Sequence, residues 1–131
     1  MAGSCLQASS GMLNLDTHIL IHALAGSLTP RERALLSRES WSISAIVLWE
    51  IAKLAQRKRI SLDFDSPEWN QVIARVRIWP LDLAVARAIA KLDFESDPTD
   101  EIIAATSLVH RVPLVTRDRR IRRSKLVPLA K

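Results

Sequence analysis

Short apolar runs alternate with longer stretches of helical spacing along most of this chain. The apolar runs predict strands over residues 12–16, 41–44, 78–81, 113–116 and 126–129. Apolar positions between them recur at the helical period and predict helices over 18–25, 30–38, 45–56, 67–76, 82–92 and 98–110. Strands separated by helices of roughly 10–15 residues favour an α/β fold with a mainly parallel central sheet.

The sequence also marks where several helices begin. Ser44 is suited to cap the helix that starts at residue 45, and Pro30, Pro67 and Pro98 fit the first turns of theirs. Ligands of parallel α/β sheets bind beyond the carboxyl ends of the strands. Asp16 and Asp118 follow predicted strands, so they fall where a site is expected.

Length and composition bound the class of protein. The 131 residues, 48% of them apolar and 25% charged, fit one globular domain, which we expect over residues 12–131 after a disordered extension at 1–11. Met12 is an alternative start of the chain. Cys5 is the only cysteine, which excludes an intrachain disulfide and a thiolate zinc site and favours a reducing, cytoplasmic location. No apolar run approaches the roughly 18–20 residues of a membrane span, so we expect no membrane partner.

The positive charge is concentrated at one end. Residues 1–110 contain 11 Lys and Arg against 13 Asp and Glu, whereas residues 111–131 contain 8 Lys and Arg and a single acid, Asp118. A basic end on a slightly acidic body indicates a polyanionic partner there. A solvated basic tail without a partner is the alternative.

Four acidic side chains stand at unusual places. Asp16 and Asp118 follow apolar strands, Asp100 lies in the first turn of a predicted helix, and Glu50 lies on a strongly apolar helix. Each has an ordinary explanation when taken alone. Asp16, Asp97 and Asp100 suit a helix start, Glu50 has Lys53 three residues away, and Asp118 has arginine neighbours.

Together the four acids favour a shared site. If the strand ends and helix starts converge, their carboxylates form an oxygen-only cluster suited to Mg²⁺ or Mn²⁺. A divalent cation would allow all of them to stay ionised at close range. His18 and His22 lie one helical turn apart without a following glutamate, and we interpret them as packed or surface histidines rather than ligands.

The segments that contain these acids resemble the PIN-domain family, and within it the VapC toxins of bacterial toxin–antitoxin pairs. The resemblance rests on residues 13–20, 44–52, 97–106 and 113–118, and it extends from residue 12 to about residue 129. It implies an α/β/α sandwich and a Mg²⁺- or Mn²⁺-dependent ribonuclease. It also implies a homodimer that is inhibited by a VapB-type antitoxin.

The resemblance assigns roles to individual residues. The acidic quartet of the family falls on Asp16, Glu50, Asp100 and Asp118, which would be both metal ligands and catalytic residues. Its supporting hydroxyls fall on Thr17 and Thr116, with Ser44 as a third candidate, and Asp97 lies beside the quartet. A basic residue often follows the third acid in the family, but here that residue is Glu101.

The hypothesis is hydrolysis of RNA phosphodiesters by a metal-activated water. Arg117, Arg119 and Arg120 flank Asp118 and are predicted to attract phosphates, a solvated loop or an antitoxin contact being the alternatives. We expect the four tryptophans to pack in the core or a dimer rather than stack on bases. Rival functions are a non-catalytic PIN-like binding protein and a metal-dependent DNA or structure-specific nuclease.

Overall fold

A four-stranded parallel sheet forms the centre of the computed structural model, which describes residues 11–131. The extension predicted at 1–11 therefore lies outside the described residues, apart from Gly11. All three strand pairings are parallel, and the strand order is β3-β2-β1-β4. The strands are β1 (Met12–Leu15), β2 (Ser40–Ser44), β3 (Val76–Trp79) and β4 (Leu114–Val115).

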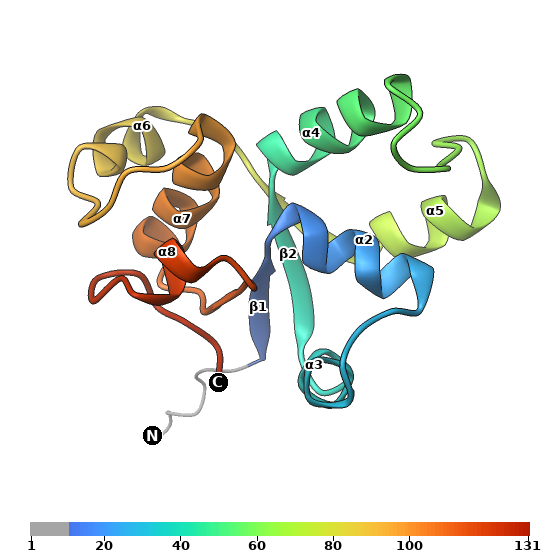
Figure 1. The fold of residues 1–131 in the computed structure, drawn as a ribbon, viewed down its shortest axis with the longest axis horizontal. Helices are drawn as coiled ribbons and strands as arrows, with labels where there is room; N and C mark the ends of the chain where they lie inside the picture. The colour runs from blue at the N-terminus through green and yellow to red at the C-terminus, as the bar shows by residue number, and fades with distance from the viewer. Residues whose placement is uncertain (1–10) are drawn as a thin grey trace.

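Helices cover both faces of the sheet, as expected for an α/β/α sandwich. In Figure 1, α2, α4 and α5 lie on one side of β1 and β2, and α6, α7 and α8 lie on the other. The helices are α2 (Thr17–Ala25), α3 (Pro30–Leu36), α4 (Ala45–Gln56), α5 (Pro67–Ile73), α6 (Leu83–Ile89), α7 (Pro98–His110) and α8 (Arg119–Arg122). The predicted fold class is confirmed.

Local signals set most helix boundaries. The Ser44 side chain accepts a hydrogen bond from the backbone N–H of Ile46, so α4 begins as predicted. Proline occupies the first helical turn of α3, α5 and α7, where its missing N–H has no intrahelical partner to lose. Gly26 ends α2 with a φ of 72°, in the left-handed region that glycine adopts without strain.

Four predicted elements were wrong in extent or kind. The helix predicted through Val76 ends at Ile73, and β3 begins at Val76 rather than at residue 78, because Val76 pairs with Trp41 of β2. The helix predicted over 82–92 ends at Ile89. The strand predicted over 126–129 is reduced to a single bridge between Leu114 and Leu129. The short helix α8 was not predicted.

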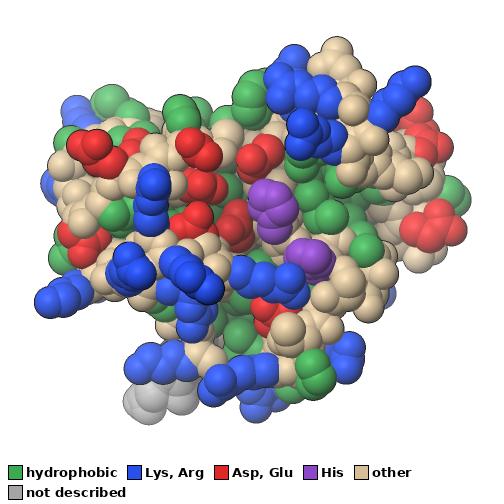
Figure 2. Space-filling view, viewed as in Figure 1, with side chains coloured by type: hydrophobic (Ala, Val, Ile, Leu, Met, Phe, Trp, Pro, Cys, Tyr) green, Lys and Arg blue, Asp and Glu red, His purple; other side chains and the backbone are tan. Residues whose placement is uncertain are grey.

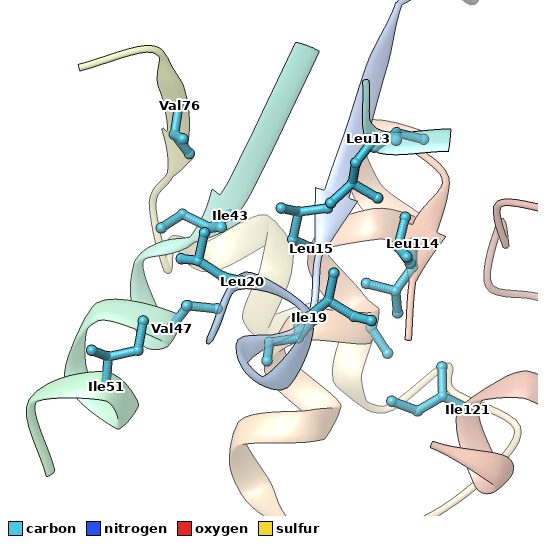
Figure 3. Packing of buried hydrophobic residues seen from close by; sticks show 14 of the residues in the cluster. Leu13, Leu15, Ile19, Leu20, Ile43, Val47, Ile51, Val76, Leu114 and Ile121 are labelled. Carbon is cyan, nitrogen blue, oxygen red and sulfur yellow. The ribbon is translucent and has the colours of Figure 1, made fainter. Parts of the chain in front are cut away.

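The core lies mainly between the sheet and α2, α4 and α7. Figure 3 shows Leu15 of β1 and Ile19 of α2 facing Leu114 of β4, with Ile121 of α8 beside them. All four side chains are completely buried. Burying a side chain of this size contributes roughly 1.5–3 kcal/mol, so Ile121 gives the basic segment at 119–122 a fixed attachment to the core.

The parallel sheet places the carboxyl ends of its strands along one edge, which we call the carboxyl edge. Leu15, Ser44, Trp79 and Val115 end their strands there. Helix α7 follows a loop, and its first turn faces the same edge, because Thr99 contacts Glu50 of α4. Among residues 11–131, no helix is both long and apolar enough to cross a membrane.

Candidate active site

The four predicted acids come together at the carboxyl edge from four different elements. Asp16 follows β1, Glu50 lies in α4, Asp100 lies in the first turn of α7, and Asp118 precedes α8. Their mutual influence is visible at Asp100. Burial and, to a lesser extent, the nearby carboxylates of the other three acids together raise the pKa of Asp100 to about 6.

Asp16 is the most buried of these acids, with 5% of its surface exposed. Strand pairing places Leu15 beside Val115, so the following residues of the two strands also meet. The Thr116 hydroxyl donates a hydrogen bond of 2.6 Å to Asp16 Oδ2. Burial raises the pKa of Asp16, and the bond from Thr116 opposes that rise.

Glu50 is oriented by two threonine hydroxyls. Thr17 of α2 donates to Glu50 Oε1, and Thr99 of α7 donates to Oε2 at 3.3 Å. The alternative partner, Lys53, instead donates to Gln56 at 3.2 Å. The alternative explanation, a Glu50–Lys53 pair, is therefore wrong, and Glu50 lies close enough to Asp100 to raise its pKa.

Asp100 and Asp118 are each held by one local donor. Ser96 Oγ donates to Asp100 Oδ2 at 3.2 Å. Asp118 caps α8, because its Oδ1 accepts the backbone N–H of Ile121 at 3.1 Å. Thr116 Oγ1 also accepts the backbone N–H of Asp118 at 3.0 Å, so the Thr116 hydroxyl connects Asp16 to the segment that contains Asp118.

The sequence also allowed each acid to be explained separately as a helix cap or a member of an ion pair, and these explanations are only partly correct. Asp16 and Asp97 occupy N-cap positions, but neither side chain makes a capping hydrogen bond. Asp118 is a cap rather than a partner of a neighbouring arginine, since the one ion pair within residues 11–131 joins Arg117 to Glu32. The Ser44 hydroxyl serves its cap at Ile46. Ser96 and Thr99, which contact Asp100 and Glu50, were not predicted.

A recess of about 370 Å³ opens beside these acids, and we call it the acidic recess. Figure 2 shows acidic side chains gathered on this face, with lysine and arginine side chains along one side. Arg119 and Arg120 therefore lie where they were predicted, next to Asp100 and Asp118. The lining residues are Ser96, Asp97, Asp100, Asp118, Arg119 and Arg120.

Arg117, unlike Arg119 and Arg120, forms an ion pair with Glu32. Its Nε and Nη2 donate to the two carboxylate oxygens of Glu32 at 2.8 and 2.7 Å, and its Nη1 lies 3.1 Å from Nε2 of His22. Arg117 Nη2 also donates to the carbonyl of Ser27 at 3.4 Å. This bidentate pair lowers the pKa of Glu32 to about 2. The guanidinium therefore fixes the segment after β4 to α2 and α3.

The donor set suits a hard divalent cation. The acids offer only oxygen ligands, and burial with mutual repulsion raises the pKa values of Asp16 and Asp100, a strain that a cation would relieve. Within residues 11–131, however, no three His, Cys, Asp or Glu side chains are already grouped as closely as in an assembled metal site. The carboxylates are instead held by hydroxyl donors, which a cation would supplement.

The tryptophan side chains mostly pack against other parts of the protein. Trp69 is buried, Trp79 stacks on His110 with ring centres 3.9 Å apart, and Trp41 donates its ring N–H to the carbonyl of Leu36. These three agree with the predicted packing role. Trp49, in α4 next to Glu50, differs because 53% of its surface is exposed.

A parallel α/β/α sandwich with four acids at the carboxyl edge defines the class of this site, and comparison with known proteins gives its family. The family model described as "PIN domain" matches residues 14–125. The chain is also 36% identical over 94 residues to Ribonuclease VapC22 of Mycobacterium tuberculosis, a match that covers 69% of this chain and 72% of the relative. The chain belongs to the PIN-domain family.

Solved structures agree on the fold. FitAcB from Neisseria gonorrhoeae superposes with a TM-score of 0.68 at 24% identity, covering 92% of this chain and 97% of that one. VapBC2 from Rickettsia felis, solved with a promoter DNA fragment, gives a TM-score of 0.67 at 17% identity, covering 91% and 97%. At such identities the likeness establishes the fold alone.

Proposed function

We propose that this protein is a Mg²⁺- or Mn²⁺-dependent endoribonuclease and the toxin of a toxin–antitoxin pair. The observation that supports it best is the meeting of Asp16, Glu50, Asp100 and Asp118 at one edge of the sheet, where three of them raise the pKa of the fourth. The similarity to a ribonuclease of the VapC type favours RNA as the substrate.

Asp16, Glu50 and Asp100 would hold the principal cation, and Asp118 would complete the set. When bound, such a cation neutralises phosphate charge and lowers the pKa of a water molecule. Hydroxyl groups fix the orientation of three of the carboxylates: Thr116 orients Asp16, Thr17 and Thr99 orient Glu50, and Ser96 orients Asp100.

Arg119 and Arg120 attract the RNA substrate to a site where the four carboxylates carry negative charge. Both side chains are exposed and line the acidic recess with Asp100 and Asp118. A phosphodiester that approaches the four carboxylates would otherwise meet only like charge. The two guanidinium groups therefore bind the phosphate backbone and position a scissile bond beside the acids.

Two partners are part of the proposal. A VapB-type antitoxin is supported by the VapC relative and by the VapBC complexes that share the fold.

A homodimer is supported by the exposed apolar side chains of Ile78, Leu81 and Leu83, near the end of β3 and the start of α6. Light scattering of wild type and Leu83→Glu would measure the oligomeric state, and a monomeric wild type would contradict the dimer.

Cleavage assays test the activity directly. Purified protein is incubated with single-stranded RNA, or with DNA of the same sequence, in Mg²⁺, Mn²⁺ or a chelator. We expect metal-dependent cleavage of RNA, and a loss of about 100-fold or more in Asp16→Asn and Asp118→Asn. Asp65→Asn is the matched control, since Asp65 is exposed and distant in sequence from the four acids.

Each other result has a defined meaning. Preferential cleavage of DNA would make the protein a DNA nuclease. RNA binding without metal-dependent turnover would make it a non-catalytic binding protein. Cleavage that survives Asp16→Asn would exclude the carboxylate site as the source of activity.

A further inference from the structure

A second recess, of about 580 Å³, is lined like the acidic recess by residues of the segment after β4, and we call it the basic recess. Thr116 lines the basic recess, while Asp118, two residues later, lines the acidic one. Residues 116–118 therefore connect the lining of one recess to that of the other. The side chains of the basic recess used below are those of Arg31, Glu32, Arg117 and Arg122.

The basic recess has uncompensated positive charge. Glu32 is the one acidic side chain in its lining, and both carboxylate oxygens of Glu32 are taken by Arg117. Arg31 and Arg122 are exposed and form no ion pair with any residue from 11 to 131. A concave surface lined by one sign of charge concentrates the electrostatic potential and attracts anions.

Arg122 is also coupled to the acidic site through Thr116. Arg122 Nη1 donates to the backbone carbonyl of Thr116 at 3.2 Å, and the hydroxyl of the same threonine donates to Asp16. The guanidinium of Arg122 therefore contacts the residue that orients Asp16. A strand bound at the carboxylates would reach this arginine as its next cationic contact on that side.

We propose that the basic recess binds a backbone phosphate of the RNA strand that occupies the acidic recess, with Arg31 and Arg122 as the contacting residues. This inference rests on the proposed function. A polyanion fits better than an acidic protein segment because the lining offers few apolar anchors, Leu35 and Ala130 alone, whereas protein interfaces depend on buried apolar and aromatic contacts.

The test measures RNA affinity without cleavage. Arg31→Gln and Arg122→Gln are combined in an Asp100→Asn background, and binding of a labelled single-stranded oligoribonucleotide is followed by fluorescence anisotropy over a range of salt concentrations. We expect the Kd to rise about tenfold and the slope of log K against log salt to fall by roughly 0.7, since one phosphate contact on a single strand contributes about 0.7.

A matched control removes the same charge elsewhere. Arg38 and Arg75 precede the first residues of β2 and β3, at the opposite edge of the sheet from the acids, and both are exposed. Arg38→Gln with Arg75→Gln should leave the Kd near that of the parent. Arg31→Gln alone serves as a second recess variant, because the Arg31 side chain has no hydrogen bond with any residue of the described range.

The outcomes separate this inference from the proposed function. If wild type cleaves RNA but the recess and control variants bind equally well, the basic recess is excluded. If wild type cleaves nothing while the recess variants alone lose RNA affinity, the nuclease proposal fails and the recess stands. If the recess variants keep RNA but lose affinity for polyglutamate, the recess binds an acidic polypeptide and the inference is overturned.

Discussion

Hydroxyl groups determine how the acidic side chains of the site are oriented. Thr116 is the clearest case, because its hydroxyl donates to Asp16 and accepts from the backbone N–H of Asp118. Thr116 has only 3% of its surface exposed, so water does not compete for these bonds. The arrangement resembles the outer-shell partners that orient carboxylate ligands in metal sites.

Replacing Thr116 with valine tests this role. Valine preserves the shape of the side chain but leaves Asp16 without its donor. We expect metal affinity or cleavage activity to fall about 10-fold to 100-fold. The cleavage rate measured over a range of Mg²⁺ concentrations gives both quantities. Thr116→Ser keeps the hydroxyl and should retain most of the activity, and an equal loss in both variants would contradict the hydrogen-bond argument.

Asp100→Asn should improve the stability of the metal-free protein while removing activity. Burial and three neighbouring carboxylates raise the pKa of Asp100 to about 6, so its charge opposes folding at neutral pH. After allowing for its partial exposure to solvent, we expect a gain of about 1 kcal/mol in the free energy of unfolding. Urea unfolding in a chelator at neutral pH measures it.

The companion measurement is the same unfolding with Mg²⁺ present. Wild type should gain stability from the cation, whereas Asp100→Asn should gain much less. A variant less stable than wild type in the chelator would mean that Asp100 is needed for folding rather than strained by its neighbours.

At the residue scale, the four acids and two of their donors, Thr17 and Thr116, could be predicted, but Ser96 and Thr99 could not. Asp16, Glu50, Asp100 and Asp118 stand out because acids are rare at strand ends and on apolar helices. Ser96 and Thr99 are ordinary loop and helix-start residues in sequence, and only the folded chain brings them to Asp100 and Glu50.

At the scale of elements, the Glu32–Arg117 pair attaches the segment after β4 to the other side of the molecule. Glu32 lies in α3 and also completes the capping box with Thr29, while Arg117 lies between Thr116 and Asp118. The position of the last acid therefore depends on a helix that contributes no carboxylate to the site.

Glu32→Gln should loosen this attachment. Because the pair lowers the pKa of Glu32 to about 2, its contribution to stability is present above a pH of about 4.5 and is lost as pH falls toward about 2. We expect a loss of roughly 0.5–1 kcal/mol at neutral pH, discounted for solvent exposure, with little change at about pH 2. Chemical unfolding at the two pH values measures the difference.

Strand pairing explains where element predictions failed. The helical spacing of apolar residues predicts a helix through Val76, but Val76 pairs with Trp41 and so belongs to β3. Helix α8 has four residues and lies in a basic run, so its sequence has no helical period to detect. Caps such as Ser44 are local, and α4 was accordingly predicted with its observed bounds.

At the scale of the whole molecule, the buried carboxylates make stability depend on both pH and metal. Burial raises the pKa values of Asp16 and Asp100, so the folded protein binds more protons than the unfolded chain between about pH 4 and about pH 6. The stability of the metal-free protein should therefore fall as pH rises through this window.

Thermal unfolding with and without Mg²⁺ tests that coupling. At a cation concentration about 100 times its Kd, binding adds about 2.7 kcal/mol. We expect the shift in Tm caused by Mg²⁺ to be larger at about pH 7.5 than at about pH 5, where protons compete for the same carboxylates. A shift independent of pH would show that the cation binds elsewhere.

The overall fold was the most predictable level, since alternating strands and helices leave few ways to bury a parallel sheet. The strand order was harder to predict from the sequence, because β4 lies beside β1 although about 100 residues separate them.

That pairing has a consequence for synthesis. A ribosome synthesises β1 about 100 residues before β4, the neighbour of β1 that completes the edge. Until then Asp16 has no Thr116 to orient it, and Asp118 does not exist. A nascent chain that lacks β4 consequently lacks the assembled carboxylate site of the proposed nuclease.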